Sequence, residues 1–228
     1  GAQGLNTVAT ARRGSSSWQL KVYGRQAHSA GIFSVGYGSI YEAARILNTF
    51  REQLGKEKYL TFNPGIIAGG SSVQYDSTNI QAHTASKTNI ISPFTVVVGD
   101  LRFITEAQKE NARRNMLKIV DTDSLLNTHA EIVFTDGIPA MEPAARNDLI
   151  VKKLSEVSLA MGIGATVAGD PDSRGAGDIS YIARYLACID GLGASGKGAH
   201  APGETINLKE FPVLVQRSAI LIYRLIRD

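Results

Sequence analysis

The sequence of 228 residues contains a single cysteine, Cys188, so the chain cannot form a disulfide within itself. It has no run of about 18 consecutive apolar residues, which argues against a membrane-spanning helix. Its 24 Lys and Arg barely exceed its 21 Asp and Glu, and no basic stripe suits a phosphate backbone. With membrane and nucleic acid set aside, a composition of 43% hydrophobic and 20% charged residues indicates a globular chain with a sizeable core.

The first residues, GAQGLNTVATARRG, lack the charged-then-apolar order of a signal peptide. Gly1 is also typical of the residue that remains after a tag is removed. The start of the chain therefore indicates no compartment, and the cytoplasm and the bacterial periplasm both stay open.

Hydrophobic periodicity predicts six elements between residues 14 and 136. Residues 16–23 alternate with Trp18, Leu20 and Val22 on one face, which is typical of a half-buried strand. The other expected elements are a helix over 38–54, strands over 59–68 and 94–104, a helix from 106 to 120, and a strand over 129–135. This order predicts a ferredoxin-like module, an antiparallel sheet with two helices on one face.

A polar stretch at 69–89 interrupts this module between its second and third strands. It is too long for a hairpin turn, so we expect an extended excursion or a ribbon. His83 lies within it and is interpreted as a solvated loop histidine.

The pattern changes after Gly137. Asn147 and Asp148 are expected to cap a helix that continues to Leu159, and Lys209 opens a long helix that ends in arginine. Between them we expect a short strand at 166–168, a short helix at 178–186 and the end of a buried strand at 188–194, with Cys188 as a small buried hydrophobe. These elements form half of an α/β layer that is poor in sheet.

Two further histidines lie in different settings. His200 stands in the glycine-rich loop GKGAHAPGE, where an imidazole can serve as a metal ligand or simply be solvated. His129 precedes a strand and is interpreted as solvated or as part of the end of the sheet.

Four short motifs follow one another along the chain. They are VYGRQAHSAG with His28, KTNIISP with Asn89, GDLRF with Arg102, and the pair SRGAGDIS and GKGAHAPGE with Asp178 and His200. Together they resemble the zinc-dependent amidohydrolase and metallopeptidase family of aminoacylase, glutamate carboxypeptidase and succinyl-diaminopimelate desuccinylase. The resemblance covers residues 14–228.

The resemblance implies a fold of class α/β with an α+β lid. A ferredoxin-like lid at 14–136, which also forms a homodimer, would be inserted in a catalytic α/β domain. Residues 137–228 would be the C-terminal portion of that domain, and residues 1–13 a linker or a remnant of it.

The resemblance also implies roles in substrate binding and catalysis. His28 would donate a hydrogen bond to the developing oxyanion in the partner's active site, the alternative being a helix cap. Arg102 would grip the substrate's carboxylate, the alternative being an exposed sheet arginine, and Asn89 would contact the same group. Independently of the resemblance, the successive backbone N–H groups of Gly175, Ala176 and Gly177 precede an expected helix and would cradle an anion, or merely cap that helix.

His200 would be the last ligand of a two-zinc site in the complete parent enzyme. The sequence, however, contains no His-x-Asp motif and no Glu-Glu pair, which carry the other ligands and the general base in the family. We therefore expect this chain to be an inactive fragment that holds no zinc stably, with Asp178 as a helix-turn carboxylate.

The predicted function is that of a C-terminal fragment of a metal-dependent hydrolase. Its substrate would be an N-acyl amino acid or small peptide with a free carboxylate, cleaved at an amide bond. The alternative is a non-catalytic dimerisation or binding module of a degenerate homologue. A regulatory ferredoxin-like ligand-binding domain would account for residues 14–136 but would leave GKGAHAPGE unexplained.

Overall fold

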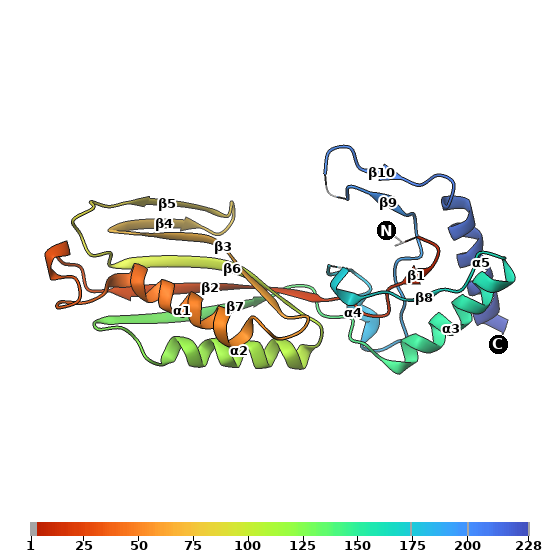
Figure 1. Ribbon diagram of the computed structural model, residues 1–228, viewed down its shortest axis with the longest axis horizontal. Coiled ribbons are helices and arrows are strands. Elements are labelled where there is room, and N and C mark those ends of the chain that lie inside the picture. The colour runs from red at the N-terminus through yellow and green to blue at the C-terminus, as the bar shows by residue number, and fades with distance from the viewer. Residues whose placement is uncertain (1–3, 174, 200, 228) are drawn as a thin grey trace. The chain divides into compact units, whose positions relative to one another are not determined.

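A computed structural model describes residues 4–173, 175–199 and 201–227 (Figure 1). The chain divides into two compact units, which are considered separately. Residues 15–137 form one, here called the sheet unit, and the residues up to Gly14 together with those from Ile138 onward form the other, the terminal unit. None of the described helices has the length and apolar character needed to cross a membrane.

The sheet unit is built on a four-stranded sheet. Its strands are β2 (Gly14–Gly24), β3 (Thr61–Gly70), β6 (Phe94–Phe103) and β7 (Thr128–Asp136), in the spatial order β3-β6-β2-β7. β2 pairs antiparallel with β7, and β3 pairs antiparallel with β6. This order confirms the ferredoxin-like topology predicted from the hydrophobic pattern.

Helices α1 (Gly38–Leu54) and α2 (Glu106–Asp121) pack against the same face of this sheet and against each other. α2 begins where predicted, because the Thr105 hydroxyl accepts a hydrogen bond from the backbone N–H of Gln108. The alternation in β2 directs Trp18, Leu20 and Val22 toward the helices, and all three are buried. Further large residues buried in this core include Ile46, Phe50, Leu101, Phe103 and Met116.

Two glycines permit close approaches inside the sheet unit. Gly38, at the start of α1, has a φ of +75°, and a Cβ there would lie 2.6 Å from Cγ2 of Ile91. A Cβ on Gly99 would lie 2.4 Å from the ring of Trp18. The second glycine therefore lets the indole lie directly on β6.

The polar stretch between β3 and β6 forms a two-stranded ribbon, which is one of the two structures expected for residues 69–89. Strand β4 (Ser72–Asp76) pairs antiparallel with β5 (Gln81–Ala85). Asp76 holds the turn, because its Oδ1 accepts the N–H groups of Thr78 at 2.8 Å and Asn79 at 3.2 Å. The ribbon lies over β3 and β6 on the side of the sheet away from α2 (Figure 1).

The terminal unit contains three helices and little sheet in its described residues. The helices are α3 (Ala145–Ala160), α4 (Ser180–Ala183) and α5 (Phe211–Arg227). Two-residue strands pair as β1 (Thr7–Val8) with β8 (Val167–Ala168), and as β9 (Gly196–Lys197) with β10 (Thr205–Ile206). A small core joins Val8, Leu154, Val157 and Leu221.

Several local expectations for this unit are wrong. Asn147 does not cap α3, which begins at Ala145; it is buried inside the helix, where Nδ2 donates to Thr10 O and Oδ1 accepts from Cys188 N. Tertiary hydrogen bonds therefore use the polar groups that a cap would have used. Residues 188–194 form no strand and make only a bridge from Asp190 to Ala9, and the helix expected at 178–186 is limited to α4.

Candidate functional site

His28 and Asn89 lie side by side at the end of the sheet unit where β2 finishes and β6 begins. The Ser29 N–H donates to Asn89 O at 2.9 Å, and the Ile91 N–H donates to Ala27 O at 2.9 Å. Both candidate side chains belong to exposed residues. The structure thus brings together two of the predicted site residues that are 61 positions apart in the sequence (89 − 28).

His28 caps the short 3₁₀ helix η1 (Ser29–Gly31), as its structural alternative required. Its Nδ1 accepts a hydrogen bond from the Ala30 N–H at 3.1 Å. A neutral imidazole that accepts at Nδ1 carries its proton on Nε2. The cap therefore leaves the outward-facing nitrogen as a donor, which is the state that stabilising an oxyanion requires.

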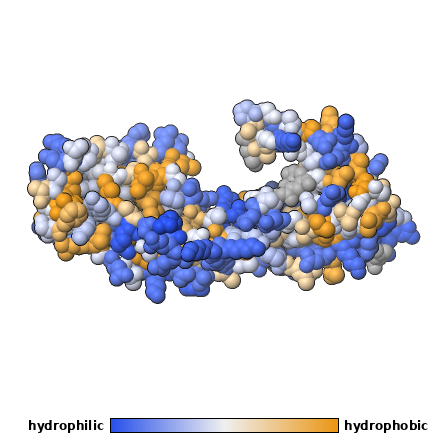
Figure 2. All heavy atoms as spheres, in the orientation of Figure 1, coloured by the Kyte–Doolittle hydropathy of each residue, from blue (hydrophilic) through white to orange (hydrophobic). Residues whose placement is uncertain are grey.

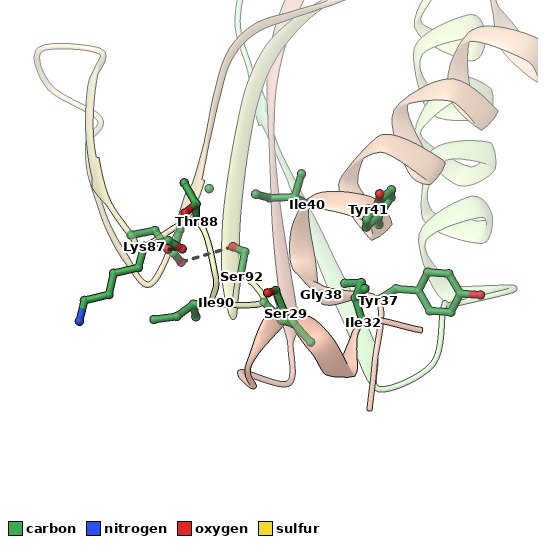
Figure 3. Close-up of a pocket in the computed structure, with 14 residues that line it drawn as sticks. Ser29, Ile32, Tyr37, Gly38, Ile40, Tyr41, Lys87, Thr88, Ile90 and Ser92 are labelled. Atoms are coloured by element: carbon green, nitrogen blue, oxygen red, sulfur yellow. Dashed lines mark hydrogen bonds between the residues drawn. The ribbon is translucent and has the colours of Figure 1, made fainter. Parts of the chain in front are cut away.

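A pocket of about 400 Å³ adjoins this pair of loops (Figure 3). Ile40 and Tyr41 reach it from α1, and Thr88 and Ile90 reach it from the loop that carries Asn89. Beneath it, the hydroxyl of Ser39 is hydrogen-bonded to those of Ser92 and Thr95 at 2.8 Å each. This buried network fixes the start of α1 against the beginning of β6.

Arg102 lies near the other end of β6. Its Nε donates to Oδ2 of Asp100 at 2.8 Å, and its side chain is 35% exposed. Among the described residues, no hydrogen bond engages its Nη1 or Nη2. Asp100 thus orients the guanidinium while its outer edge stays available for a planar anion.

Arg102 is far from His28 and Asn89 within one chain. The eight residue steps along β6 from Phe94 to Arg102 correspond to roughly 26 Å at about 3.3 Å per residue. His28 and Asn89 adjoin the Phe94 end, where Gly24 N donates to Pro93 O. One small substrate cannot contact all three residues of a single chain.

The turn at Gly175–Gly177 is held from its carbonyl side. Arg12 Nε donates to Gly175 O at 2.9 Å and Nη2 donates to Ala176 O at 3.0 Å, while Nη1 pairs with the carboxylate of Asp190. A Cβ on Gly177 would lie 2.7 Å from the guanidinium carbon of Arg12. Arg12 therefore fixes the turn whose N–H groups are the predicted anion cradle.

The predicted metal ligand His200 lies outside the described residues. Within residues 4–173, 175–199 and 201–227, no group of three or more His, Cys, Asp and Glu side chains could hold a metal ion. His83 is exposed but lies in strand β5 and not in the loop that was expected. His129 lies in β7, and its ring stacks on that of Tyr23 with centroids 4.6 Å apart. The described residues therefore do not form a metal centre by themselves.

Clear pKa shifts occur away from these residues. The hydrogen bonds from Arg113 and Lys109 lower the pKa of Asp136 at the end of β7. Burial alone would lower the pKa of Lys109, but its bonds to Glu106 and Asp136 outweigh that effect and raise it. This cluster is a structural ion-pair network at the end of the sheet.

Sequence reasoning missed Arg12 and Asp100. The pairing of Asp100 with Arg102 could have been predicted, because residues two apart on a strand share a face and Asp100 precedes Arg102 by two. Arg12 gave no local signal, since its partner Gly175 is 163 positions away.

A family model described as a peptidase dimerisation domain matches residues 10–126. Comparison with curated protein sequences gave no match. The fold is similar to that of a tripeptidase from Staphylococcus aureus (TM-score 0.77, 18% identity, 100% of this chain and 56% of that one) and of aminopeptidase PepT from Bacillus cereus (0.73, 16%, 97% and 54%). It is also similar to a dinuclear metal-binding M20 peptidase from Bacillus subtilis (0.63, 15%, 96% and 52%). The chain spans about half the length of these structures.

Proposed function

Since the chain belongs to the family of M20 peptidases through its dimerisation domain, we propose that it is the substrate-binding and C-terminal part of a metal-dependent amide hydrolase. The substrate is an N-acyl amino acid or small peptide with a free carboxylate. Two zinc ions act in the complete enzyme, and the 228 residues alone are inactive. The observation that carries this proposal is the orientation of Arg102 by Asp100 with its outer guanidinium edge available.

His28 and Asn89 serve the active site of a partner subunit in this proposal. The separation along β6 supports it, because Arg102 and the two loop residues meet one substrate only when different copies contribute them. A two-fold axis beside the edge strand β3 would pair it antiparallel with its copy and reverse the sheet direction. The end that carries His28 would then lie level with Arg102 of the other copy.

The surface formed by β3 and α1 suits this pairing. Ile40, Tyr41 and Ile67 on it are each more than half exposed. The opposite edge, β7 with α2, carries instead the charged cluster of Lys109, Arg113 and Asp136. Apolar surface is the part that gains most from burial against a copy, which favours the β3 and α1 surface.

Each of these residues has one chemical task. Arg102 binds the carboxylate in two parallel hydrogen bonds, the turn at Gly175–Gly177 offers N–H groups, and Nε2–H of His28 donates to the carbonyl oxygen as negative charge develops. His200 is the residue of this chain that would hold a metal ion, and the bound ions of the complete enzyme would supply a polarised water. Asn89 orients the same substrate beside His28.

The test is an Arg102→Ala substitution in a protein that joins these 228 residues to the rest of an M20 catalytic domain. A charge-assisted contact of about 1.5–3 kcal/mol predicts a loss of roughly tenfold to hundredfold in kcat/KM. The loss should apply to a carboxylate substrate and not to its amide. Arg51→Ala, which changes an exposed arginine on α1, is the matched control.

Equal kcat/KM for wild type and Arg102→Ala on the carboxylate substrate would contradict the role of this arginine. If the wild-type protein turns over no amide substrate while it still dimerises and binds carboxylates, the non-catalytic binding module becomes the correct function.

A further inference from the structure

The ribbon β4–β5 and the helix-free face of the sheet enclose a cleft of about 580 Å³. We propose that this cleft binds a bulky apolar side chain of the substrate whose carboxylate Arg102 holds. The inference rests on the proposed function and extends it, because it assigns the part of the substrate that confers specificity.

The walls of the cleft come from three directions. Tyr75 and Ile80 line it from the ribbon, Ile66 and Val98 from β3 and β6, and Val133 from β7. Ile80 is 65% exposed and Val133 is 54% exposed, although both lie beside apolar neighbours. An apolar group that entered the cleft would remove this surface from water, which is the usual source of affinity in such sites.

Ile80 is held in an unusual conformation. Its φ of +54° lies in the left-handed region, which a β-branched residue rarely adopts. The turn held by Asp76 keeps it there, with a further bond from Asn79 Nδ2 to Asp76 Oδ2 at 2.7 Å. Conformations of this kind gather at binding sites, where the surroundings fix a side chain for contact with a ligand.

Arg102 adjoins the cleft through Asp100, which lines the cleft and accepts a hydrogen bond from Nε of Arg102. Val98, Asp100 and Arg102 alternate along β6 and share its helix-free face, and Val98 and Asp100 both line the cleft. Two residue steps along a strand are about 7 Å. An amino acid whose carboxylate is bound at Arg102 therefore has its side chain within reach of the cleft.

Size and charge define the class of side chain. The volume lies in the range of small-molecule sites and exceeds what a methyl group would fill. The carboxylate of Asp100 disfavours an acidic side chain at this place. Aromatic and long aliphatic side chains fit both conditions, while glycine would leave the cleft unfilled.

The indole of Trp18 lies on the helix side of the sheet and is buried, so binding in the cleft is followed by titration calorimetry and not by fluorescence. The full 228-residue chain is titrated with N-acetylphenylalanine, N-acetylglycine and N-acetylphenylalanine amide. We expect a saturable heat change with N-acetylphenylalanine and a Kd about tenfold or more below that of N-acetylglycine. Ile80→Ser should weaken binding of N-acetylphenylalanine and leave N-acetylglycine unchanged.

Leu126→Ser is the control, because Leu126 is 50% exposed and does not line the cleft. Circular dichroism verifies that both variants keep the fold. Equal affinities for the two acids, no saturable binding of N-acetylphenylalanine, or no effect of Ile80→Ser would overturn the proposal. If the amide binds as tightly as the acid and Ile80→Ser weakens both, the cleft is supported and the carboxylate role of Arg102 fails.

Discussion

Two helices of 17 residues each show how differently the units cover their apolar surface. α1 in the sheet unit buries Ile46, Phe50 and Leu54 against a four-stranded sheet. α5 in the terminal unit buries Leu214 and Leu221 but leaves Ile226 79% exposed. Figure 2 shows the resulting apolar surface over α5. The burial of an apolar helix therefore depends on the size of the surface that it packs against, which is a four-stranded sheet for α1 and a much smaller core for α5.

The two units also differ in how they hydrogen-bond a buried charged side chain, and Arg217 is the example in the terminal unit. It is fully buried in α5, where Nη1 donates to Leu5 O and Thr166 Oγ1, while Nε and Nη2 have no hydrogen-bond partner among the described residues. Burial lowers the pKa of its guanidinium. The sheet unit instead gives its buried carboxylate, Glu42, two hydrogen bonds from Arg45 and one from Leu125 N. A buried charge is costly unless it is paired, so Glu42 is the better compensated of these two buried groups.

The largest expected effect separates these two helices. Phe50→Ala should lower the free energy of unfolding of the sheet unit by about 3–5 kcal/mol, since it opens a cavity in a closed core. Ile226→Ala on α5 should change stability by about 0.5 kcal/mol or less, because the side chain is already in water. Denaturant unfolding followed by Trp18 fluorescence and by far-UV circular dichroism measures both. Similar losses for the two variants would contradict the comparison.

An intermediate effect concerns the surface that the sheet unit leaves open. Ile67→Glu should shift the chain from dimer to monomer at micromolar concentration, because a charge would be buried in the proposed β3 and α1 surface. Leu117→Glu, at an exposed site on α2, should leave the dimer intact. Light scattering gives the mass. A wild-type monomer would remove the dimer, and with it the role of His28 in a partner's site.

The smallest effect is a pH dependence in the sheet unit. Asp136 has a pKa below its ordinary value of 3.8, so its ion pairs stabilise the fold above that value and lose this contribution as the pH falls through the lower folded value. Because the side chain is 68% exposed, Asp136→Asn should cost only about 0.5 kcal/mol at pH 7. The difference from wild type should shrink as the pH falls below 3.8. Unfolding midpoints at several pH values, with Glu131→Gln as a control, measure it.

The alternation of β2 and the cap at Thr105 were enough to predict the sheet unit, because its elements are long and each has a local signal. The terminal unit was predicted less well. Asn147 looks like a cap in sequence, yet its bonds to Thr10 and Cys188 span 137 and 41 positions. Contacts between residues so far apart in the sequence produce no hydrophobic periodicity from which they could be predicted.

The candidate site shows the same limit. The motifs identified His28, Asn89 and Arg102 one by one, but the backbone bridge that joins the first two and the strand length that separates the third required the fold. The cleft under the ribbon was equally hidden, since Ile80 is an isolated apolar residue in a polar stretch and Val133 stands in an apolar run that only indicates a strand.

The one thiol and the one indole of this chain fall in different units. Cys188 is 5% exposed, its backbone N–H is tied to Asn147, and burial raises the pKa of its thiol. A thiol-modifying reagent therefore reacts only when the surroundings of Cys188 open. The rate of modification measures how often the terminal unit opens locally. Trp18 lies in the sheet unit, and its emission follows the unfolding of that unit. Each unit thus contains one natural probe, the thiol or the indole, and both can be followed in a single sample without any introduced label.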